Sequence, residues 1–169
     1  MLKTIVLAIA IAVAPSAAAQ WASPVLHTRT LADAAFAIPT DLPDRPSVLV
    51  IGFTEASREQ ASAWSRMLAR DGALGDMVTT YQVVVLDDVP GLVRRFVVGG
   101  IRRGVPESLH DRFLVVSDQA DDWKALVSFA EPDVAYLVLL DGRGNPRWRG
   151  TGAPDAASLQ ALRRVASGL

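Results

Sequence analysis

Four short apolar runs after residue 46 constrain the fold of this chain more than any other feature of its sequence. They are VLVIGF (48–53), TYQVVVLD (80–87), RFLVVSD (112–118) and VAYLVLLD (134–141). Continuous apolar runs of this length are typical of strands that are buried on both faces of a sheet. We therefore expect a central sheet with both faces covered.

Helical patterns fill the intervals between these runs. Residues 57–70 place apolar side chains on one helical face, with Ser57 expected as the N-terminal cap and Gln60 completing a capping box. A second helix is expected to begin with Asp88 as its cap and to be weakened at its end by two consecutive glycines. Its predicted inward stripe consists of Val89, Leu92, Val93, Phe96 and Val97.

The last third of the chain predicts a short helix, a hairpin and a final helix. The helix QADDWKALVSF (119–129) should bury Trp123, and the turn DGRGNP should join the fourth strand to a partner strand at RWRG (147–150). Residues 153–166 read as the final helix. This order predicts an α/β, thioredoxin-like three-layer fold, with a mixed central sheet, helices on both faces and a C-terminal β-hairpin plus helix.

The first residues have the features of a secretory signal peptide, which we assign to 1–19. Lys3 precedes an apolar stretch at 5–14, and three alanines at 17–19 fit the cleavage pattern. This predicts a periplasmic or secreted protein, with an uncleaved membrane anchor as the alternative. The proline-rich residues 20–46 are expected to form an extended lead-in whose FAI segment is a possible edge strand, and 47–169 to form the thioredoxin-like domain.

The chain contains no cysteine, which excludes disulfides, thiol catalysis and cysteine-ligated metal centres. His27 and His110 are too far apart in the sequence to suggest a metal-ligand pattern, and no cofactor is expected. A formal net charge of −1 gives no global attraction to nucleic acid, so no nucleic-acid partner is predicted.

The segment VIGFTEAS resembles the active turn of peroxiredoxins, in which a Thr-x-x-Cys spacing follows the first core strand. Thr54 matches that motif, and Ser57 stands where the peroxidatic cysteine would be. The resemblance implies a related fold without the peroxidase chemistry. A serine nucleophile would need an adjacent base and an oxyanion site, so Ser57 is expected to act as a helix cap.

A more specific motif lies in the last third of the chain. It is an apolar strand, then Asp-x-x-Gly, then Arg-Trp-Arg-Gly-x-Gly, then a helix, and its residues are Asp141, Gly144, Arg147, Trp148, Arg149, Gly150 and Gly152. With this motif, the chain resembles the mitochondrial ATP synthase assembly factors that have a thioredoxin-like domain, and their bacterial relatives. The mitochondrial members are implicated in assembling the membrane sector of the synthase, so the resemblance implies an assembly or protein-binding role.

Three groups of residues are candidate binding sites. The first is the rim formed by Thr54, Ser57 and the turn before the fourth strand, where thioredoxin-like domains hold extended peptides. The second comprises four arginines within ten residues that contain no acid, and it reads either as a solvated helix face or as an adaptable loop for an acidic partner or anionic headgroups. These are Arg94, Arg95, Arg102 and Arg103.

The third group is the pair Arg147 and Arg149, which alternate along a strand and should share one of its faces, with Trp148 on the other. Such arginines bind carboxylates or phosphates well. They are also the charges that discourage an edge strand from pairing with another molecule. The sequence leaves both interpretations open.

These observations predict an exported, cysteine-free and non-redox protein that binds an envelope or inner-membrane protein, with peripheral membrane contact possible. The alternative is an enzyme without thiol chemistry that binds a small oxyanion through Thr54, Ser57 and Arg147. A third option is a structural relict within a larger envelope assembly.

Overall fold

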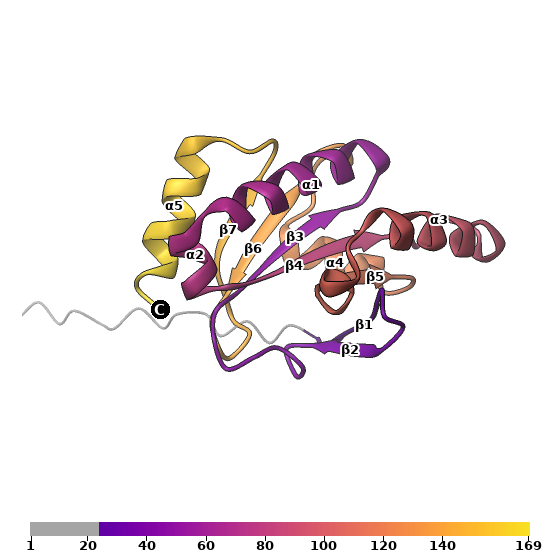
Figure 1. Ribbon diagram of the computed structural model, residues 1–169, viewed down its shortest axis with the longest axis horizontal. Helices are drawn as coiled ribbons and strands as arrows, with labels where there is room; N and C mark the ends of the chain where they lie inside the picture. Colours follow the sequence, from indigo (N-terminus) through magenta and orange to yellow (C-terminus); the bar gives the residue numbers. More distant parts are fainter. Residues whose placement is uncertain (1–23) are drawn as a thin grey trace, which may run out of the picture.

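The computed structural model describes residues 24–169, which form one mixed sheet with helices on both faces (Figure 1). The strands are β1 (Leu26–Thr30), β2 (Ala35–Ile38), β3 (Ser47–Gly52), β4 (Thr79–Val85), β5 (Phe113–Val116), β6 (Tyr136–Leu140) and β7 (Pro146–Thr151). The helices are α1 (Glu55–Arg70), α2 (Gly72–Met77), α3 (Gly91–Gly104), α4 (Ala120–Val127), α5 (Ala156–Ala166) and the short 3-10 helix η1 (Glu107–Arg112). The predicted signal peptide lies outside the described residues.

The four apolar runs form the centre of the sheet, in the strand order β2-β1-β5-β4-β3-β6-β7. β3 pairs in parallel with β4, and β4 pairs in parallel with β5, whereas β6 is antiparallel to both β3 and β7. Every residue of β3, β5 and β6 is buried, as continuous apolar runs require. The predicted thioredoxin-like arrangement, with its hairpin and final helix, is confirmed.

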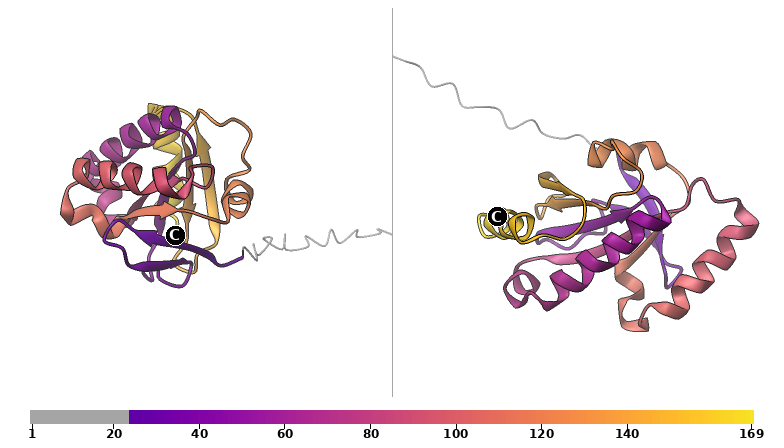
Figure 2. Two further views of the ribbon diagram at one scale, coloured as in Figure 1. Left: turned by 90° about the vertical axis from the view of Figure 1, so that its right-hand side faces the viewer. Right: turned by 90° about the horizontal axis from the view of Figure 1, so that it is seen from above.

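Helices cover the two faces of the sheet unequally. On one face, α4 packs the fully buried Trp123 against alternate residues of the central strands. On the other face, α1 and α5 cover one cluster around Trp64, and α3 covers a second, smaller cluster at the β4–β5 side. The right-hand view of Figure 2, which is seen from above, shows α4 on one side of the sheet and α1 with α3 on the other.

The segment predicted as an extended lead-in contains two strands. The FAI strand is present as β2 at the edge of the sheet, but β1 was not predicted. β1 pairs with β2 and with β5, and its residues alternate between buried and exposed. Two of its three buried positions are threonines, Thr28 and Thr30, so a search for apolar residues misses the alternation.

The α3 helix differs from its prediction in three respects. Its N-cap is Pro90 instead of Asp88, and no side-chain hydrogen bond caps it. It continues through Gly99-Gly100 to Gly104, so the segment of Arg94 to Arg103 is helical throughout and not a loop. Its predicted inward stripe is wrong at three positions, because Leu92, Val93 and Phe96 are 72%, 51% and 79% exposed. The inward contacts come from a second helical stripe, which comprises Val97, Val98 and Ile101. Within residues 24–169, no helix is long and apolar enough to cross a membrane.

Candidate functional site

The rim of the fold lies where β3 ends and α1 begins. Thr54 is the N-cap of α1, and its hydroxyl accepts a hydrogen bond from the backbone N–H of Ser57 at 3.2 Å. In return, the Ser57 hydroxyl accepts from the Thr54 N–H at 2.8 Å, which completes a capping box. The prediction that Ser57 caps the helix with Gln60 is therefore wrong. The helix begins two residues earlier than predicted, because the Thr54 hydroxyl caps it and Glu55 favours its positive N-terminal end.

The Ser57 hydroxyl is fully occupied by these local contacts. The residue is 0% exposed, and its oxygen also accepts from the N–H of Phe53 at 2.8 Å and donates to the Thr54 carbonyl at 3.1 Å. Neither histidine of the described chain lies beside it, since His27 is on β1 and the His110 ring is hydrogen-bonded to the Val105 carbonyl. Ser57 therefore has none of the surroundings of a nucleophile.

Contacts across the rim fix the turn before β6. The Thr54 hydroxyl lies 2.8 Å from the carboxylate of Asp133 and 3.2 Å from the Pro132 carbonyl. The Gln60 side chain donates to the Asp133 carbonyl at 3.1 Å and accepts from the Ala135 N–H at 3.2 Å. A carboxylate beside Thr54 repels an incoming anion, so these contacts hold the turn in place and disfavour oxyanion binding.

The structure does not bring Arg147 to this rim. In the β6–β7 ladder, Tyr136 pairs with Thr151 near the rim, and Leu140 pairs with Pro146 at the far end. Arg147 follows Pro146 and lies 3.9 Å from the Asp141 carboxylate. Arg147 is thus at the end of the β6–β7 hairpin that is remote from Thr54 and Ser57.

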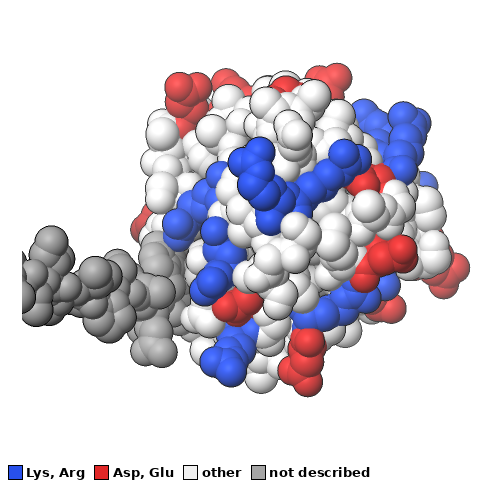
Figure 3. All heavy atoms as spheres, turned by 90° about the vertical axis from the view of Figure 1, so that its left-hand side faces the viewer, with Lys and Arg blue, Asp and Glu red and all other residues white. Residues whose placement is uncertain are grey.

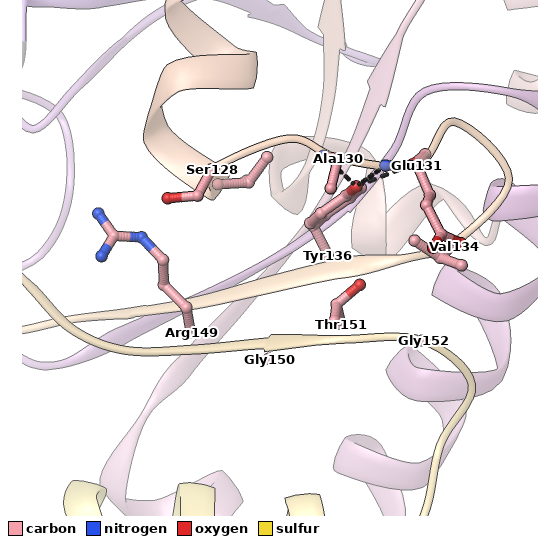
Figure 4. Close-up of a pocket in the computed structure, with 10 residues that line it drawn as sticks. Ser128, Ala130, Glu131, Val134, Tyr136, Arg149, Gly150, Thr151 and Gly152 are labelled. Carbon is pink, nitrogen blue, oxygen red and sulfur yellow. Dashed lines mark hydrogen bonds between the residues drawn. The ribbon is translucent and has the colours of Figure 1, made fainter.

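An open pocket of about 330 Å³ lies next to the rim, between β7 and the loop at 128–135 that precedes β6 (Figure 4). Its lining is mostly apolar, with charged groups at the edge. The lining residues are Val127, Ser128, Ala130, Glu131, Val134, Tyr136, Arg149, Gly150, Thr151 and Gly152. We call this the β7 pocket. The sequence analysis pointed to the turn before β6 but did not predict a pocket beside it.

Tyr136 makes the β7 pocket a preformed feature. Its phenol oxygen accepts from the backbone N–H groups of Ala130 and Glu131, at 3.0 and 2.8 Å, and its hydroxyl donates to the Glu131 carbonyl at 2.8 Å. Its ring packs against Phe53 and Phe129, with centroids 5.7 and 5.6 Å away. Since Phe53 precedes Thr54, one aromatic cluster supports both the rim and the pocket.

Arg149 and Thr151 project from β7 on the same face, toward the pocket (Figure 4). The Nε of Arg149 donates to the Leu126 carbonyl at 2.8 Å, which ties the strand to the end of α4. Trp148 points to the opposite face and packs into the cluster beneath α1 and α5, as predicted. The motif RWRG therefore joins two layers of the fold and also supplies one wall of the β7 pocket.

The four arginines of α3 do not share one role. Arg94 is bound to its own end of the helix, where Nε and Nη2 donate to the Val89 carbonyl at 3.2 and 2.9 Å. The side chains of Arg95, Arg102 and Arg103 are exposed and have no hydrogen-bond or ion-pair partner among residues 24–169. Only these three remain as a basic surface. Within the same described part of the chain, no cluster of three potential metal-ligating side chains occurs.

Comparison with known proteins assigns the chain to a family. The model of the ATP10 protein family matches residues 18–169. The chain belongs to the ATP10 family. No curated protein matches it.

Solved structures similar to this ATP10-family protein have the thioredoxin fold. The exposed lipoprotein thioredoxin Etrx1 of Streptococcus pneumoniae has a TM-score of 0.55 and 10% identity, covering 83% of this chain and 98% of its own. Copper-bound ScoI of Arabidopsis thaliana has a TM-score of 0.56 and 11% identity, covering 87% and 99%. A DsbF homologue of Corynebacterium diphtheriae has a TM-score of 0.53 and 18% identity, covering 86% and 84%. At these identities the likeness concerns the fold alone.

The ATP10-family chain carries hydroxyls at the spacing where thioredoxin-type redox motifs carry thiols. In a Cys-x-x-Cys motif, the thiolate is favoured by the N-terminus of a helix. Here Thr54 and Ser57 have the same two-residue separation at the start of α1, and their oxygens are 3.3 Å apart. Each oxygen is used in helix capping, so this position stabilises the start of α1.

Proposed function

We propose that this ATP10-family protein is a non-redox assembly factor that holds an extended segment of an envelope or inner-membrane protein in the β7 pocket. The observation that carries the proposal is the saturated Ser57 hydroxyl at the start of α1. In this thioredoxin-like scaffold, a capping box occupies the position where redox-active relatives have thiols. Binding of another protein is then the function that such a scaffold can still perform. The family relation supports an assembly role, and the leader-like residues 1–19 support a location in the cell envelope.

The β7 pocket suits a peptide segment with one apolar side chain. Val127, Val134 and Tyr136 supply an apolar lining, and Glu131 with Arg149 supplies opposite charges at its edge. Tyr136 fixes the loop before any ligand arrives, so little ordering entropy opposes binding. β7 ends the sheet order, so it offers an edge strand beside the pocket, and extended peptides are commonly bound along such an edge.

The rival function, an oxyanion-binding enzyme at the rim, has less support. It requires Thr54, Ser57 and Arg147 to share one point, and the β6–β7 register separates them. It also requires an anion beside the Asp133 carboxylate. A protein binder needs neither condition.

A blocking variant tests the proposal. Thr151 is exposed and projects into the pocket, so Thr151→Trp should fill it without disturbing the core (Figure 4). The tagged full chain is crosslinked in cells, purified from detergent-solubilised envelope, and its adducts are identified by mass spectrometry. We expect a specific membrane-protein adduct that Thr151→Trp reduces at least tenfold.

The matched control is Gln160→Trp, which adds the same side chain at an exposed position on α5. It should leave the adduct unchanged. Equal adduct yields in both variants would exclude the β7 pocket as the binding site. Disulfide or peroxide reduction by the purified wild-type protein would contradict the non-redox assignment.

A further inference from the structure

The α3 helix presents large apolar side chains to solvent. Phe96 is 79% exposed, Leu92 72% and Val93 51%, and these three lie within one and a half turns of the helix. No residue of α3 is fully buried, and in Figure 1 the helix reaches beyond the right-hand end of the sheet. Apolar side chains exposed on a protruding helix are therefore available for an external contact.

Unpaired positive charges flank this apolar surface. Arg95 lies beside Phe96, and Arg102 with Arg103 occupies the last turn of α3. No acidic residue occurs anywhere between Gly91 and Gly104. Because the formal net charge of the whole chain is −1, this is a local concentration of positive charge rather than a global excess.

Other basic groups of the protein are arranged differently. The end of the molecule that carries α5 and α2 faces the viewer in Figure 3, where basic and acidic side chains are interspersed. On that side Arg163 is paired with the carboxylate of Asp71, which is only 5% exposed. Among the described helices, only α3 combines exposed large apolar groups with several arginines and contains no acidic residue; η1, which exposes Leu109, also contains Glu107 and Asp111.

We infer that α3 is a membrane-surface helix that docks the protein on an anionic bilayer, with Leu92, Val93 and Phe96 entering the interface. A helix with exposed Leu and Phe on one side and arginines on its flanks fits the interfacial mode, in which shallow apolar insertion and attraction to anionic headgroups add together. Three apolar side chains form a patch far smaller than a stable protein interface needs, which favours the bilayer over a protein partner. The arginine stems can lie along the interface while their guanidinium groups reach the headgroups.

This contact is independent of the β7 pocket. α3 rests on the cluster at the β4–β5 side of the sheet, whereas the pocket lies between β7 and the loop at 128–135. A protein docked through α3 would keep the pocket accessible to a membrane-protein segment. Thr151→Trp, which blocks the pocket, should leave the bilayer contact unchanged, so the two proposals can fail separately.

Vesicle sedimentation of the full chain tests the inference. We expect stronger binding to vesicles that contain about one third phosphatidylglycerol than to vesicles of phosphatidylcholine alone, because anionic headgroups attract the arginines of α3. Removing Arg102 and Arg103 together, as Arg→Ala changes, should weaken binding about 25-fold, at about fivefold for each arginine. Phe96→Ser should weaken it on the order of tenfold.

Matched control variants on other helices test whether bilayer binding depends on α3. Arg66→Ala with Arg164→Ala removes the same charge from exposed positions on α1 and α5, and Leu109→Ser removes an apolar group that is 47% exposed on η1. These variants should bind as the wild type does. Because every variant retains the N-terminal residues, any binding through that segment is common to all of them. Equal binding by the α3 variants and the controls, or no preference for anionic vesicles, would overturn the inference.

A second readout uses the absence of cysteine, which allows a single labelled thiol at any chosen position. An environment-sensitive fluorophore on Phe96→Cys should shift to the blue on anionic vesicles and be quenched by nitroxide-labelled lipids. The same label on Gln160→Cys, on α5, should do neither. Insertion of neither label, or of both, would show that α3 is not the docking surface.

Discussion

Ser57→Ala tests most directly whether the serine at the rim stabilises the fold or takes part in catalysis. The Ser57 oxygen accepts hydrogen bonds from the N–H groups of Phe53 and Thr54, both at 2.8 Å. Alanine cannot accept either bond, because its methyl side chain has no acceptor atom. The two N–H groups would then lack a protein partner.

The expected cost follows from these two donors. A buried N–H left unsatisfied costs about 1–3 kcal/mol, and both of these groups are only partly buried, which favours the lower half of that range. Alanine has the better helix propensity, which offsets about 0.5 kcal/mol. Ser57→Ala should therefore lower the free energy of unfolding by about 2 kcal/mol and the midpoint of thermal unfolding by about 4–8 °C.

Urea unfolding followed by tryptophan fluorescence measures this change, because Trp64 and Trp123 are both fully buried. Ser167→Ala is the control, since that hydroxyl is exposed and bonds only the Arg164 carbonyl, and its effect should stay below about 0.5 kcal/mol. If Ser57→Ala is as stable as the control variant, the hydroxyl does not maintain the capping box and the structural assignment is wrong. Loss of an activity without loss of stability would favour the enzyme alternative.

Three further substitutions test other parts of the structure. The double variant Thr54→Cys with Ser57→Cys should form an intramolecular disulfide under oxidising conditions, because the two hydroxyl oxygens are 3.3 Å apart at the Cys-x-x-Cys spacing. Labelling of both thiols by an alkylating reagent after oxidation would contradict this prediction. Trp64→Phe should destabilise the protein by about 1–2 kcal/mol more than Trp123→Phe, because the Trp64 indole N–H donates to the Gly152 carbonyl at 2.9 Å, whereas that of Trp123 has no hydrogen-bond partner within residues 24–169. Equal costs in urea unfolding would refute this reasoning. Although partial burial raises the pKa of Asp141, hydrogen bonds in the β6–β7 turn and a nearby arginine together lower it, so its stabilisation is present above the ordinary pKa of about 3.9 and is lost as the pH falls through the lower folded value. Asp141→Ala should accordingly reduce the unfolding free energy at pH 7 and differ less from the wild type below about pH 3; an equal difference at both pH values would exclude this origin.

The central sheet could be predicted because its strands are defined by strong and uninterrupted apolar runs. VLVIG at 48–52 has no polar residue, and all of its positions are buried in the structure. The order of strands and helices then leaves few topologies, since crossovers are short and right-handed. The inward direction of Trp148 in the hairpin could also be predicted, because side chains alternate between the two faces of a strand.

α3 shows where local pattern reasoning fails. Two overlapping stripes of apolar residues occur on this helix, one through Leu92 and Phe96 and another through Val97 and Ile101. Only one can face a sheet, and helical periodicity alone does not decide between them. The position of α3 over β4 and β5 selects the second stripe, so the first is left in solvent.

The candidate site was predicted only in part for a different reason. Thr54 and Ser57 are local in sequence, and their place at the start of a helix was evident. The contact of Thr54 with Asp133 joins segments 79 residues apart, and Tyr136 packs on Phe53 across a similar separation, so no local sequence pattern reveals either contact. An aromatic residue that opens a buried strand is the one signal that could have directed attention to the β7 pocket.

The small cluster beneath α3 has a consequence for how this scaffold can vary. Val97, Val98 and Ile101 attach the helix to the sheet from below, and nothing in the main core depends on the residues that point outward. Mutations at Leu92, Val93 or Phe96 can therefore accumulate with little penalty to folding. One domain could in this way be redirected to different surfaces in different lineages while the sheet itself stays unchanged.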